Sequence, residues 1–334
     1  MKGIFLTDAS IDTVYRVYGA DIRRKLEHEI ELFPDIIGRG AMHDKREILR
    51  ETNVIFSTWG MPYCEEEEIK ACFPVLKAVF YAAGSVQSFA REFLNCGIKV
   101  FSAWAANAIP VAEYTVAQII LANKGFFQSA RKMKPEMYFN ARQHAESFPG
   151  NIGIKVGLIG CGMIGSLVSQ KLREYHVDVN VYDPFLPDSR ANELGVKKCS
   201  LIEVFSECQT ISNHLPDNAS TKDMLNYRLF SIMKENAVLI NTGRGAQVVE
   251  DDLIQALREC PERTAVLDVT YPEPPVASSG LFALDNVILT PHIAGSMSNE
   301  LARIGEYAYN EFISFKNGSP LQYEVTAKML DTMA

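Results

Sequence analysis

Short apolar runs alternate with longer amphipathic stretches along most of the chain. In the first hundred residues the runs lie at 3–6, 54–57, 78–81 and 98–101, and each has the length of a buried strand. Between the first two runs, residues 11–32 place apolar side chains at helical spacing and many charges on the opposite face. This alternation predicts a small parallel α/β domain.

The same alternation continues after residue 150. Longer apolar runs at 154–159 and 177–182 predict strands, and shorter ones follow at 210–212, 238–240, 265–269 and 287–289. Residues 299–315 again have the pattern of an amphipathic helix. We therefore predict an α/β fold with two Rossmann-like domains, each a doubly wound parallel sheet.

Two segments between these halves differ from the rest. Residues 110–123 begin with a proline and are apolar over most of their surface, which predicts a buried helix. Residues 124–150 are basic, carry methionines and aromatic residues, and end in a Pro-Gly pair. Two interpretations of this second segment stay open: an arm that packs on a partner subunit, or a mobile loop.

Composition argues against several classes of function. Of the 334 residues, 47% are hydrophobic and 22% are charged, which is typical of a globular protein with two domains. The net charge of −8 argues against contact with nucleic acid or an anionic membrane. There is no run of 18 apolar residues and no apolar leader, so we expect neither a membrane span nor a signal peptide. The seven cysteines are scattered without a Cys-x-x-Cys pair, and no metal-ligand spacing occurs; we expect reduced thiols, a cytoplasmic protein and no metal site.

A glycine motif follows directly after the apolar run at 154–159. Gly160, Gly162 and Gly165 open a segment whose apolar residues recur at helical spacing. In a dinucleotide site the first glycine makes the tight turn, the second lets the backbone approach a pyrophosphate, and the third lets the helix pack on the strand. The free N–H groups at the helix start then face the phosphates. Because other glycine-rich turns share this spacing, the motif needs its context.

That context includes an acidic residue after the next strand. Asp183 ends the run at 177–182, about 20 residues beyond the glycines. A carboxylate there accepts hydrogen bonds from the ribose hydroxyls of NAD and repels the 2′-phosphate of NADP. Pro184 and Phe185 follow it, in place of the arginine that a phosphate would require. The pattern predicts NAD (NADH) as the cofactor.

Three later strand ends carry polar residues that a packed core would not place there. Arg244 lies between glycines, in a loop that would present its guanidinium fork to a carboxylate. Asp268 closes the next strand, Glu273 lies between two prolines, and His292 follows the last strand. Together they suit hydride transfer to a 2-keto acid. The arginine would bind the carboxylate, the histidine would donate a proton to the forming alkoxide, and the glutamate would orient the histidine and favour its charged form.

Two turns of the first domain are candidate substrate contacts, because ligands of open α/β sheets bind beyond the carboxyl ends of strands. Trp59 and Gly60 follow one predicted strand, and Ala83, Gly84 and Ser85 follow another. Backbone N–H groups at Gly84 would suit a small anion. A packing role is an equally good interpretation of Trp59.

Taken in order, these motifs resemble those of the D-isomer-specific 2-hydroxyacid dehydrogenases over most of the chain. The resemblance is carried by 160–165, 183–184, 214–216, 241–245, 268–274 and 290–295, with Asn107 and 111–113 before them. It implies that the catalytic residues are Arg244, Glu273 and His292. The implied cofactor contacts are Gly160, Gly162, Met163, Ile164, Gly165, Asp183, Pro184, His214, Pro216, Thr242, Gly243, Arg244, Asp268, His292, Ala294 and Gly295, with Asp268 near the nicotinamide carboxamide. The implied substrate contacts are Trp59, Gly60, Ala83, Gly84, Ser85, Arg244 and His292.

The resemblance also implies a domain layout. Residues 1–105 would form the first segment of the substrate domain, to which a C-terminal helix in 295–334 returns. Residues 106–294 would form the inserted NAD-binding domain, and the arm at 124–150 would make a homodimer. We also expect no regulatory domain of the kind that some phosphoglycerate dehydrogenases carry.

Two departures from the family pattern lie on the substrate side. Residues 82–86 read Ala-Ala-Gly-Ser-Val where the family usually has Gly-Ala-Gly-Val-Asp, and Ala105-Ala106 replaces a usual Pro-Gly. The turn at 57–61 has no lysine or arginine to anchor a phosphorylated substrate. We expect interconversion of a small 2-keto acid, such as glyoxylate, hydroxypyruvate or pyruvate, and its D-2-hydroxy acid. Formate fits less well, because formate dehydrogenases resemble a Gln-His pairing where this chain has Glu273.

One alternative comes from a different functional class. Some proteins on this scaffold sense NAD(H) and act as binding proteins or transcriptional corepressors, and such a protein could keep every motif above. The acidic composition argues against DNA contact. Tight NADH binding with turnover near zero would mark this alternative.

Overall fold

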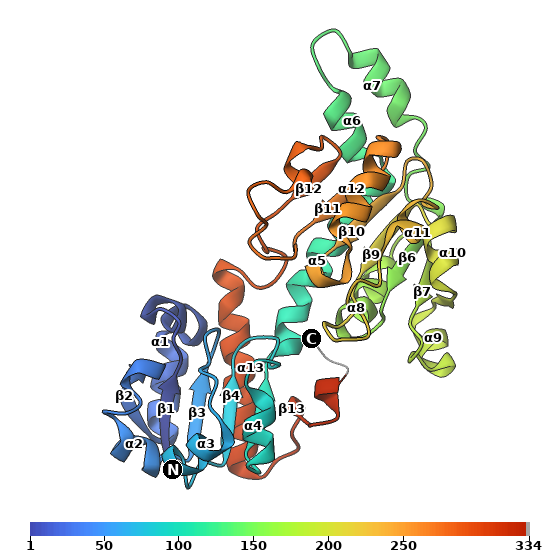
Figure 1. Ribbon diagram of the computed structural model, residues 1–334. Coiled ribbons are helices and arrows are strands. Elements are labelled where there is room, and N and C mark those ends of the chain that lie inside the picture. Colours follow the sequence, from blue (N-terminus) through green and yellow to red (C-terminus); the bar gives the residue numbers. More distant parts are fainter. Residues whose placement is uncertain (332–334) are drawn as a thin grey trace. The chain divides into compact units, whose positions relative to one another are not determined.

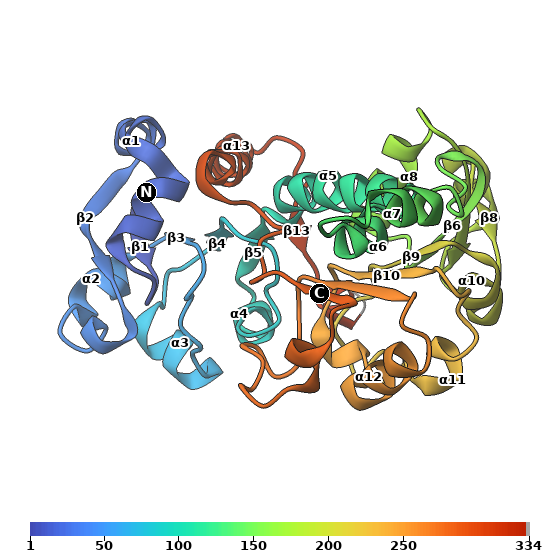
Figure 2. The ribbon, with the colours of Figure 1, turned by 90° about the horizontal axis from the view of Figure 1, so that it is seen from above.

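The computed structural model describes residues 1–331, so the last three residues of the predicted segment 295–334 lie outside the described part. The chain forms two compact units. The first unit comprises Met1–Ala108 and the segment that starts at Ser296, and the second unit comprises Ile109–Gly295. Each unit holds one sheet with helices on both of its faces (Figure 2), which confirms the predicted fold class.

The first unit is built on a six-stranded sheet with the order β13-β5-β4-β3-β1-β2. Only β13 is antiparallel to its neighbour. The strands are β1 (Lys2–Leu6), β2 (Glu31–Ile37), β3 (Val54–Ser57), β4 (Ala78–Tyr81), β5 (Lys99–Ser102) and β13 (Glu324–Val325). One face is covered by α1 (Ile11–Glu29) and α13 (Leu301–Asn317), and the other by α2 (Arg46–Glu51), α3 (Glu66–Cys72) and α4 (Ala90–Asn95) (Figure 2). Short 3₁₀ turns lie at Arg39–Ala41, Ser298–Glu300 and Met329–Asp331.

Strand β2 was not predicted from the sequence. The helix expected at 11–32 ends at Glu29, and the next residues form an edge strand that pairs with β1. Its side chains are mostly half-buried or exposed, and Pro34 interrupts the run. An edge strand tolerates a proline because one side of its backbone has no partner strand. The strand therefore lacks the apolar alternation that identified the others.

The second unit is built on a seven-stranded, fully parallel sheet with the order β12-β11-β10-β9-β6-β7-β8 (Figure 1; β8 is labelled in Figure 2). The strands are β6 (Ile152–Ile159), β7 (His176–Tyr182), β8 (Lys197–Lys198), β9 (Thr210–Asn213), β10 (Val238–Asn241), β11 (Thr264–Leu267) and β12 (Val287–Leu289). Helix α8 (Met163–Leu172) lies on one face, and α10 (Leu201–Glu207), α11 (Tyr227–Phe230) and α12 (Glu250–Glu259) lie on the other (Figure 2). Helix α9 (Asp188–Leu194) and 3₁₀ turns at Gly245–Gln247 and Gly280–Ala283 complete the unit.

Helix α5 (Trp104–Asn123) begins six residues before the predicted start at Pro110. The proline lies inside the helix, where its missing N–H removes one bond of the ladder without ending it. Within residues 1–331, α5 is the one helix whose length and hydropathy would suit a membrane span. In the fold it packs on the second sheet, where buried Thr115 contacts Thr242 (Oγ1–Oγ1 3.1 Å) and Asn123 accepts from Thr210 Oγ1 (2.6 Å). These contacts are those of a core helix.

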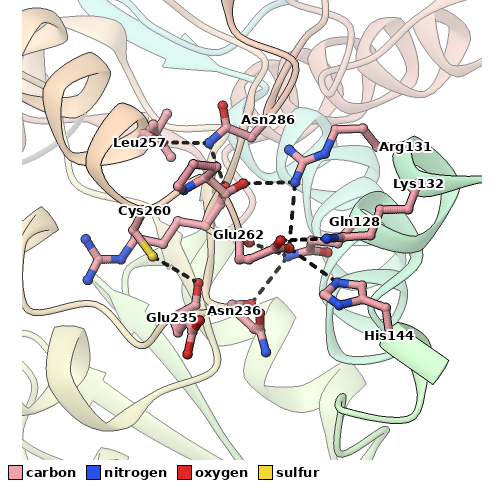
Figure 3. Close-up of polar contacts among 12 residues, drawn as sticks. Gln128, Arg131, Lys132, His144, Glu235, Asn236, Leu257, Cys260, Glu262 and Asn286 are labelled. Carbon is pink, nitrogen blue, oxygen red and sulfur yellow. Dashed lines mark hydrogen bonds and ion pairs between the residues drawn. The ribbon is translucent and has the colours of Figure 1, made fainter. Parts of the chain in front are cut away.

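Residues 124–150 contain two helices, α6 (Phe126–Lys132) and α7 (Tyr138–Ala145). The pair is fixed to the rest of the second unit by a cluster of charged side chains, the Glu262 cluster, which consists of Arg131, Lys132, His144 and Glu262 (Figure 3). Lys132 Nζ lies 2.6 Å from Glu262 Oε1, and His144 Nε2 lies 3.3 Å from Oε2. Gln128, buried beside them, donates from Nε2 to the carbonyl oxygens of Asn236 and Glu262 (3.3 and 3.4 Å). The predicted contact with a partner subunit stays a prediction.

Candidate functional site

The glycine motif forms the turn between β6 and α8. Gly160 has φ +90°, and a Cβ there would lie 2.8 Å from the carbonyl oxygen of His214. A Cβ at Gly165 would lie 2.3 Å from the carbonyl oxygen of Gly160, so this helix can approach the turn only through glycine. A Cβ at Gly162 would meet nothing within 4 Å. The backbone in front of the helix start, with Met163 and Ile164 in its first turn, therefore has the open approach that a dinucleotide pyrophosphate needs.

Asp183 follows β7 and holds the same turn. Its Oδ2 accepts from Cys161 N (2.8 Å), and its Oδ1 accepts from Phe185 N (2.9 Å), across Pro184. Each carboxylate oxygen keeps a second lone pair, so the pair of ribose hydroxyls can still be accepted. The one cation nearby on α9, Arg190, lies 2.6 Å from Glu193 in an ion pair. These residues fit the adenosine half of NAD.

His214 and Pro216 lie in the loop after β9, beside the glycine turn. His214 donates its backbone N–H to Ile159 O (2.7 Å), and its Nε2 lies 3.0 Å from Ser212 Oγ. Burial lowers the pKa of His214 to about 4, so the imidazole is neutral near pH 7. This histidine contributes shape and a neutral polar surface, and not a positive charge, to the predicted cofactor pocket.

Arg244 lies in the loop after β10. Gly245 next to it is required by contact, since a Cβ there would lie 2.0 Å from the carbonyl carbon of Thr270. The guanidinium donates from Nη1 to Gly243 O (2.8 Å), and the side chain is half-buried. None of the ion pairs found within residues 1–331 includes Arg244. Its charge therefore has no carboxylate partner in this part of the chain.

Glu273 and His292 are in direct contact, as the sequence led us to expect for a catalytic pair. His292 Nδ1 lies 2.6 Å from Glu273 Oε1, and the two side chains are 49% and 41% exposed. His292 has φ +54°, a left-handed conformation that is strained for a residue with a Cβ. With Nδ1 bound to the carboxylate, Nε2 is the ring nitrogen that is free to exchange a proton with a ligand.

Asp268 fixes the loop that carries His292. Its buried carboxylate accepts from Thr290 Oγ1 (2.6 Å) and from the backbone N–H groups of Ile293 and Ala294 (2.9 Å each). The strand predicted at 265–269 ends at Leu267, although the Asp268 backbone N–H still donates to Asn241 O (3.0 Å). The nicotinamide contact that the resemblance implied for Asp268, like those for Ala294 and Gly295, stays a prediction.

Arg244, Glu273 and His292 follow β10, β11 and β12, which are adjacent in the second sheet. The carboxyl ends of adjacent parallel strands meet at one edge, so all three loops open on the same side of the sheet. Thr242 and Gly243 lie buried in the first of these loops. This edge is the candidate active site of the second unit.

The predicted substrate residues of the first unit lie in two turns after β3 and β4. Trp59 is 38% exposed, and its carbonyl oxygen accepts from Thr7 Oγ1 (2.7 Å). Gly60 has φ +86° and packs against the backbone of Ala9. The second turn contains Ala83, Gly84 and Ser85. The Ser102 hydroxyl lies within hydrogen-bond distance of the carbonyl oxygens of Ala83 and Gly84 (3.0 and 2.6 Å). Substrate contact by these residues stays a prediction.

Sequence comparison and structural comparison give the same relationship. The NAD-binding domain of the D-isomer specific 2-hydroxyacid dehydrogenases matches residues 116–294, more than half of the chain. A D-3-phosphoglycerate dehydrogenase of Haemophilus influenzae is 34% identical over 262 residues, which cover 76% of this chain and 62% of that protein. The chain belongs to the D-isomer-specific 2-hydroxyacid dehydrogenase family. The predicted family and the predicted cofactor, NAD, are thereby confirmed.

Solved structures share the fold at lower identity. The D-mandelate dehydrogenase of Rhodotorula graminis superposes with a TM-score of 0.80 at 20% identity, covering 97% of each chain. The NAD-dependent formate dehydrogenase of Staphylococcus aureus, solved with NAD, superposes with a TM-score of 0.69 at 24% identity, covering 98% of this chain and 99% of that one. A D-3-phosphoglycerate dehydrogenase of Archaeoglobus fulgidus is 28% identical over 70% of this chain, which spans 44% of that protein's length.

Three buried amide side chains beside Arg244 were not found by sequence reasoning. They are Asn213, Asn241 and Gln247, and they are at most 1% exposed. Asn241 falls within the motif at 241–245, and none of the motifs includes Asn213 or Gln247. The available signal was weak: each is a polar residue at or just after a buried strand, which a packed core would not require.

Proposed function

We propose that this dehydrogenase reduces a small 2-keto acid to its D-2-hydroxy acid with NADH. One observation carries the proposal: the contact between His292 and Glu273 lies at the sheet edge that also presents Arg244, in the unit that belongs to the NAD-binding family. Reduction of a keto acid requires a proton donor with an orienting carboxylate, and a guanidinium that, like Arg244, forms no ion pair within residues 1–331.

The three side chains have different roles in this reaction. Arg244 binds the substrate carboxylate and polarises the keto group. His292 donates the Nε2 proton to the keto oxygen, which becomes the hydroxyl, while Glu273 holds the ring through Nδ1 and stabilises the charged imidazole before transfer. NADH, when bound, supplies the hydride to the same carbon. Oxidation of the hydroxy acid runs these steps in reverse, with neutral His292 as the base.

The substrate we propose has no phosphate, as in glyoxylate, hydroxypyruvate or pyruvate. The turn after β3 carries no lysine or arginine. Arg39, on a neighbouring loop of the first unit, forms an ion pair with Glu68 (Nη1–Oε1 2.7 Å). A phosphorylated keto acid, the type of substrate suggested by the names of the phosphoglycerate dehydrogenase relatives, is the rival that the assay must include.

The experiment is NADH oxidation, followed at 340 nm, against a panel of 2-keto acids with and without phosphate, with NADPH in parallel. We expect turnover with one small unphosphorylated acid and a clear preference for NADH. Preference for the phosphorylated acid would overturn the substrate proposal. Absence of turnover with every acid, while NADH still binds tightly, would replace the enzyme by the NAD(H)-sensing or corepressor alternative.

We also propose a homodimer formed through the arm, in a cytoplasmic protein. Helices α6 and α7 and the turn between them expose apolar side chains: Phe126 50%, Met133 53%, Met137 41%, Tyr138 57% and Phe139 81%. An apolar surface of this kind is typical of a subunit interface. All seven cysteines are free thiols, which suits a reducing compartment. Sedimentation analysis of the wild type and Phe139→Asp tests the dimer; a monomeric wild type would contradict it.

A further inference from the structure

The polar core beneath the Arg244 loop is made of neutral amides. The amide cluster, as we name Asn213, Asn241 and Gln247, is almost completely inaccessible to solvent. Asn213 Nδ2 donates to Asn241 Oδ1 (3.0 Å) and to Gln247 Oε1 (2.5 Å). Buried amides that were merely tolerated would leave donors without partners, at a cost in stability. Here they bond to one another and to two loops.

The first of these loops carries Arg244. Asn241 Nδ2 donates to the carbonyl oxygen of Arg244 (3.1 Å), and Gly243 N donates to Asn241 Oδ1 (3.1 Å). The backbone N–H of Arg244 donates to Gln247 Oε1 (3.3 Å). Both backbone polar groups of Arg244 are thus held by side chains of the amide cluster. The direction in which the guanidinium leaves the loop is therefore set by the cluster.

The second loop is the one after β9 that lines the predicted cofactor pocket. Gln247 Nε2 donates to the carbonyl oxygens of Leu215 (2.8 Å) and Pro216 (2.7 Å). Leu215 N in turn donates to Asn213 Oδ1 (3.2 Å). Gln247 therefore uses all of its hydrogen-bonding capacity: two donors on the cofactor loop, and an oxygen that accepts from Asn213 and from the Arg244 loop.

We propose that Gln247 is a positioning residue that fixes the carboxylate-binding geometry of Arg244 and couples it to the loop at 214–216. The inference rests on the proposed function, because it assumes that Arg244 binds the substrate carboxylate. A neutral amide suits this task since it orients the loop without an anion that would compete for the guanidinium. A merely structural glutamine would contribute to folding and leave substrate affinity unchanged.

Gln247→Met tests the proposal, because methionine nearly preserves the volume and removes every hydrogen bond. We expect the KM for the keto acid to rise about tenfold or more, the loss of one charge-assisted contact, with a smaller fall in kcat. The backbone amides of Gly243 and Arg244 should exchange their hydrogens faster than in the wild type. An unchanged KM together with unchanged amide exchange would overturn the proposal.

Gln128→Met is the matched control. Gln128 is also fully buried in the second unit and also donates to two carbonyl oxygens, but it lies on α6 and contacts neither loop. We expect a lower Tm for both variants and a raised KM only for Gln247→Met. An equal rise of KM in both would assign the effect to general loosening of the fold and reject positioning.

Gln247→Glu provides a rescue that a structural role would not give, and it carries the test if the methionine variant is insoluble. The introduced carboxyl keeps the acceptor and regains one donor when it is protonated, and its buried site raises its pKa. The ratio of the variant's KM to that of the wild type should therefore fall toward one between pH 8 and pH 6; a ratio independent of pH would count against positioning. If the wild type reduces no keto acid, the proposed function fails, while amide exchange at 243–244 still decides whether Gln247 holds the loop.

Discussion

The second unit contains two His–Glu pairs that differ in distance, in exposure and in the charges around them. His292 and Glu273 meet at 2.6 Å on loops at the carboxyl edge of the sheet, and both are almost half exposed. His144, on helix α7 of the arm, lies 3.3 Å from Glu262, and the two side chains are 17% and 28% exposed. Only the second pair is flanked by cations, with Lys132 and Arg131 both on Glu262 (Figure 3).

The flanking charges decide what each pair can do. Burial lowers the pKa of His144, and the adjacent Lys132 lowers it further. The carboxylate of Glu262 raises this pKa by less, so the pKa stays below its ordinary value. Burial tends to raise the pKa of Glu262, but Lys132 and the other cations outweigh it and leave that pKa below its usual value. Glu262 is therefore an anion that holds the arm, while His292 is the one ion-pair partner that Glu273 has within residues 1–331. A carboxylate beside a histidine therefore suggests proton transfer only where that carboxylate forms no ion pair with another cation.

The largest expected effect follows from replacing each histidine in turn. His292→Asn removes the proposed proton donor and should lower kcat by roughly 10²–10⁴-fold, the range for one acid/base group. NADH affinity, measured by fluorescence titration, should stay within about threefold. His144→Asn is the matched control and should leave kcat within about twofold. Equal losses in both variants would remove the distinction between the pairs, and an unchanged kcat in His292→Asn would remove that residue from its role.

A smaller effect is expected from the two arginines near these pairs. Arg244→Lys keeps the charge and loses the planar fork, so kcat/KM for the keto acid should fall roughly tenfold to a hundredfold, equivalent to one charge-assisted hydrogen bond. Arg131→Lys changes a residue that bonds Pro261 O and Glu262, and should leave kcat/KM unchanged. Steady-state kinetics on the same keto acid measures both. Wild-type efficiency in Arg244→Lys would show that a point charge suffices and reject the bidentate clamp.

The sequence predicted most of the sheet and the first contacts of the site because both depend on local patterns. Ten of the predicted apolar runs form strands. Sequence motifs also identified Glu273 and His292, which lie in direct contact at 2.6 Å. What failed lacked a local pattern. Edge strand β2 is half exposed and interrupted by Pro34, and α5 continues through residues before Pro110 that gave no start signal.

The amide cluster could not be predicted for a different reason. Asn213 and Gln247 are far apart in the sequence, and a glutamine after a glycine loop is ordinarily a solvent-exposed residue. The pairing of β9 with β10 places Asn213 beside Asn241, and the 3₁₀ turn after β10 brings Gln247 to Asn213. Likewise, nothing in the sequence shows which of the dispersed histidines shares its carboxylate with a lysine, because Lys132 and Glu262 meet only in the fold. The motifs of this chain can therefore be found from the local sequence, whereas the contacts that position their side chains appear only in the fold.

Glu262→Gln tests the arm side of the comparison through stability. Removing the anion leaves the positive charges of Lys132 and Arg131 close together without a carboxylate partner, so the free energy of unfolding should fall by about 1 kcal/mol, at the upper end for partly exposed pairs. Glu273→Gln should leave stability nearly unchanged and lower kcat instead. Urea unfolding of both variants measures this. A stable Glu262→Gln, or one whose loss persists undiminished at high salt, would contradict an electrostatic attachment of the arm.

The smallest effect is a dependence of stability on pH to which the arm pair should contribute. The folded state lowers the pKa of His144 below its ordinary value of about 6.5, so the unfolded chain binds that proton more readily. Stability should therefore fall as pH drops below about 6.5, since protonation then favours unfolding. His144→Asn should reduce this slope between pH 7 and 5.5 without abolishing it, because buried His214, with its pKa lowered to about 4, acts in the same direction. Thermal melts across that range at constant ionic strength provide the measurement; a slope equal to that of the wild type would show that the arm pair does not titrate with unfolding.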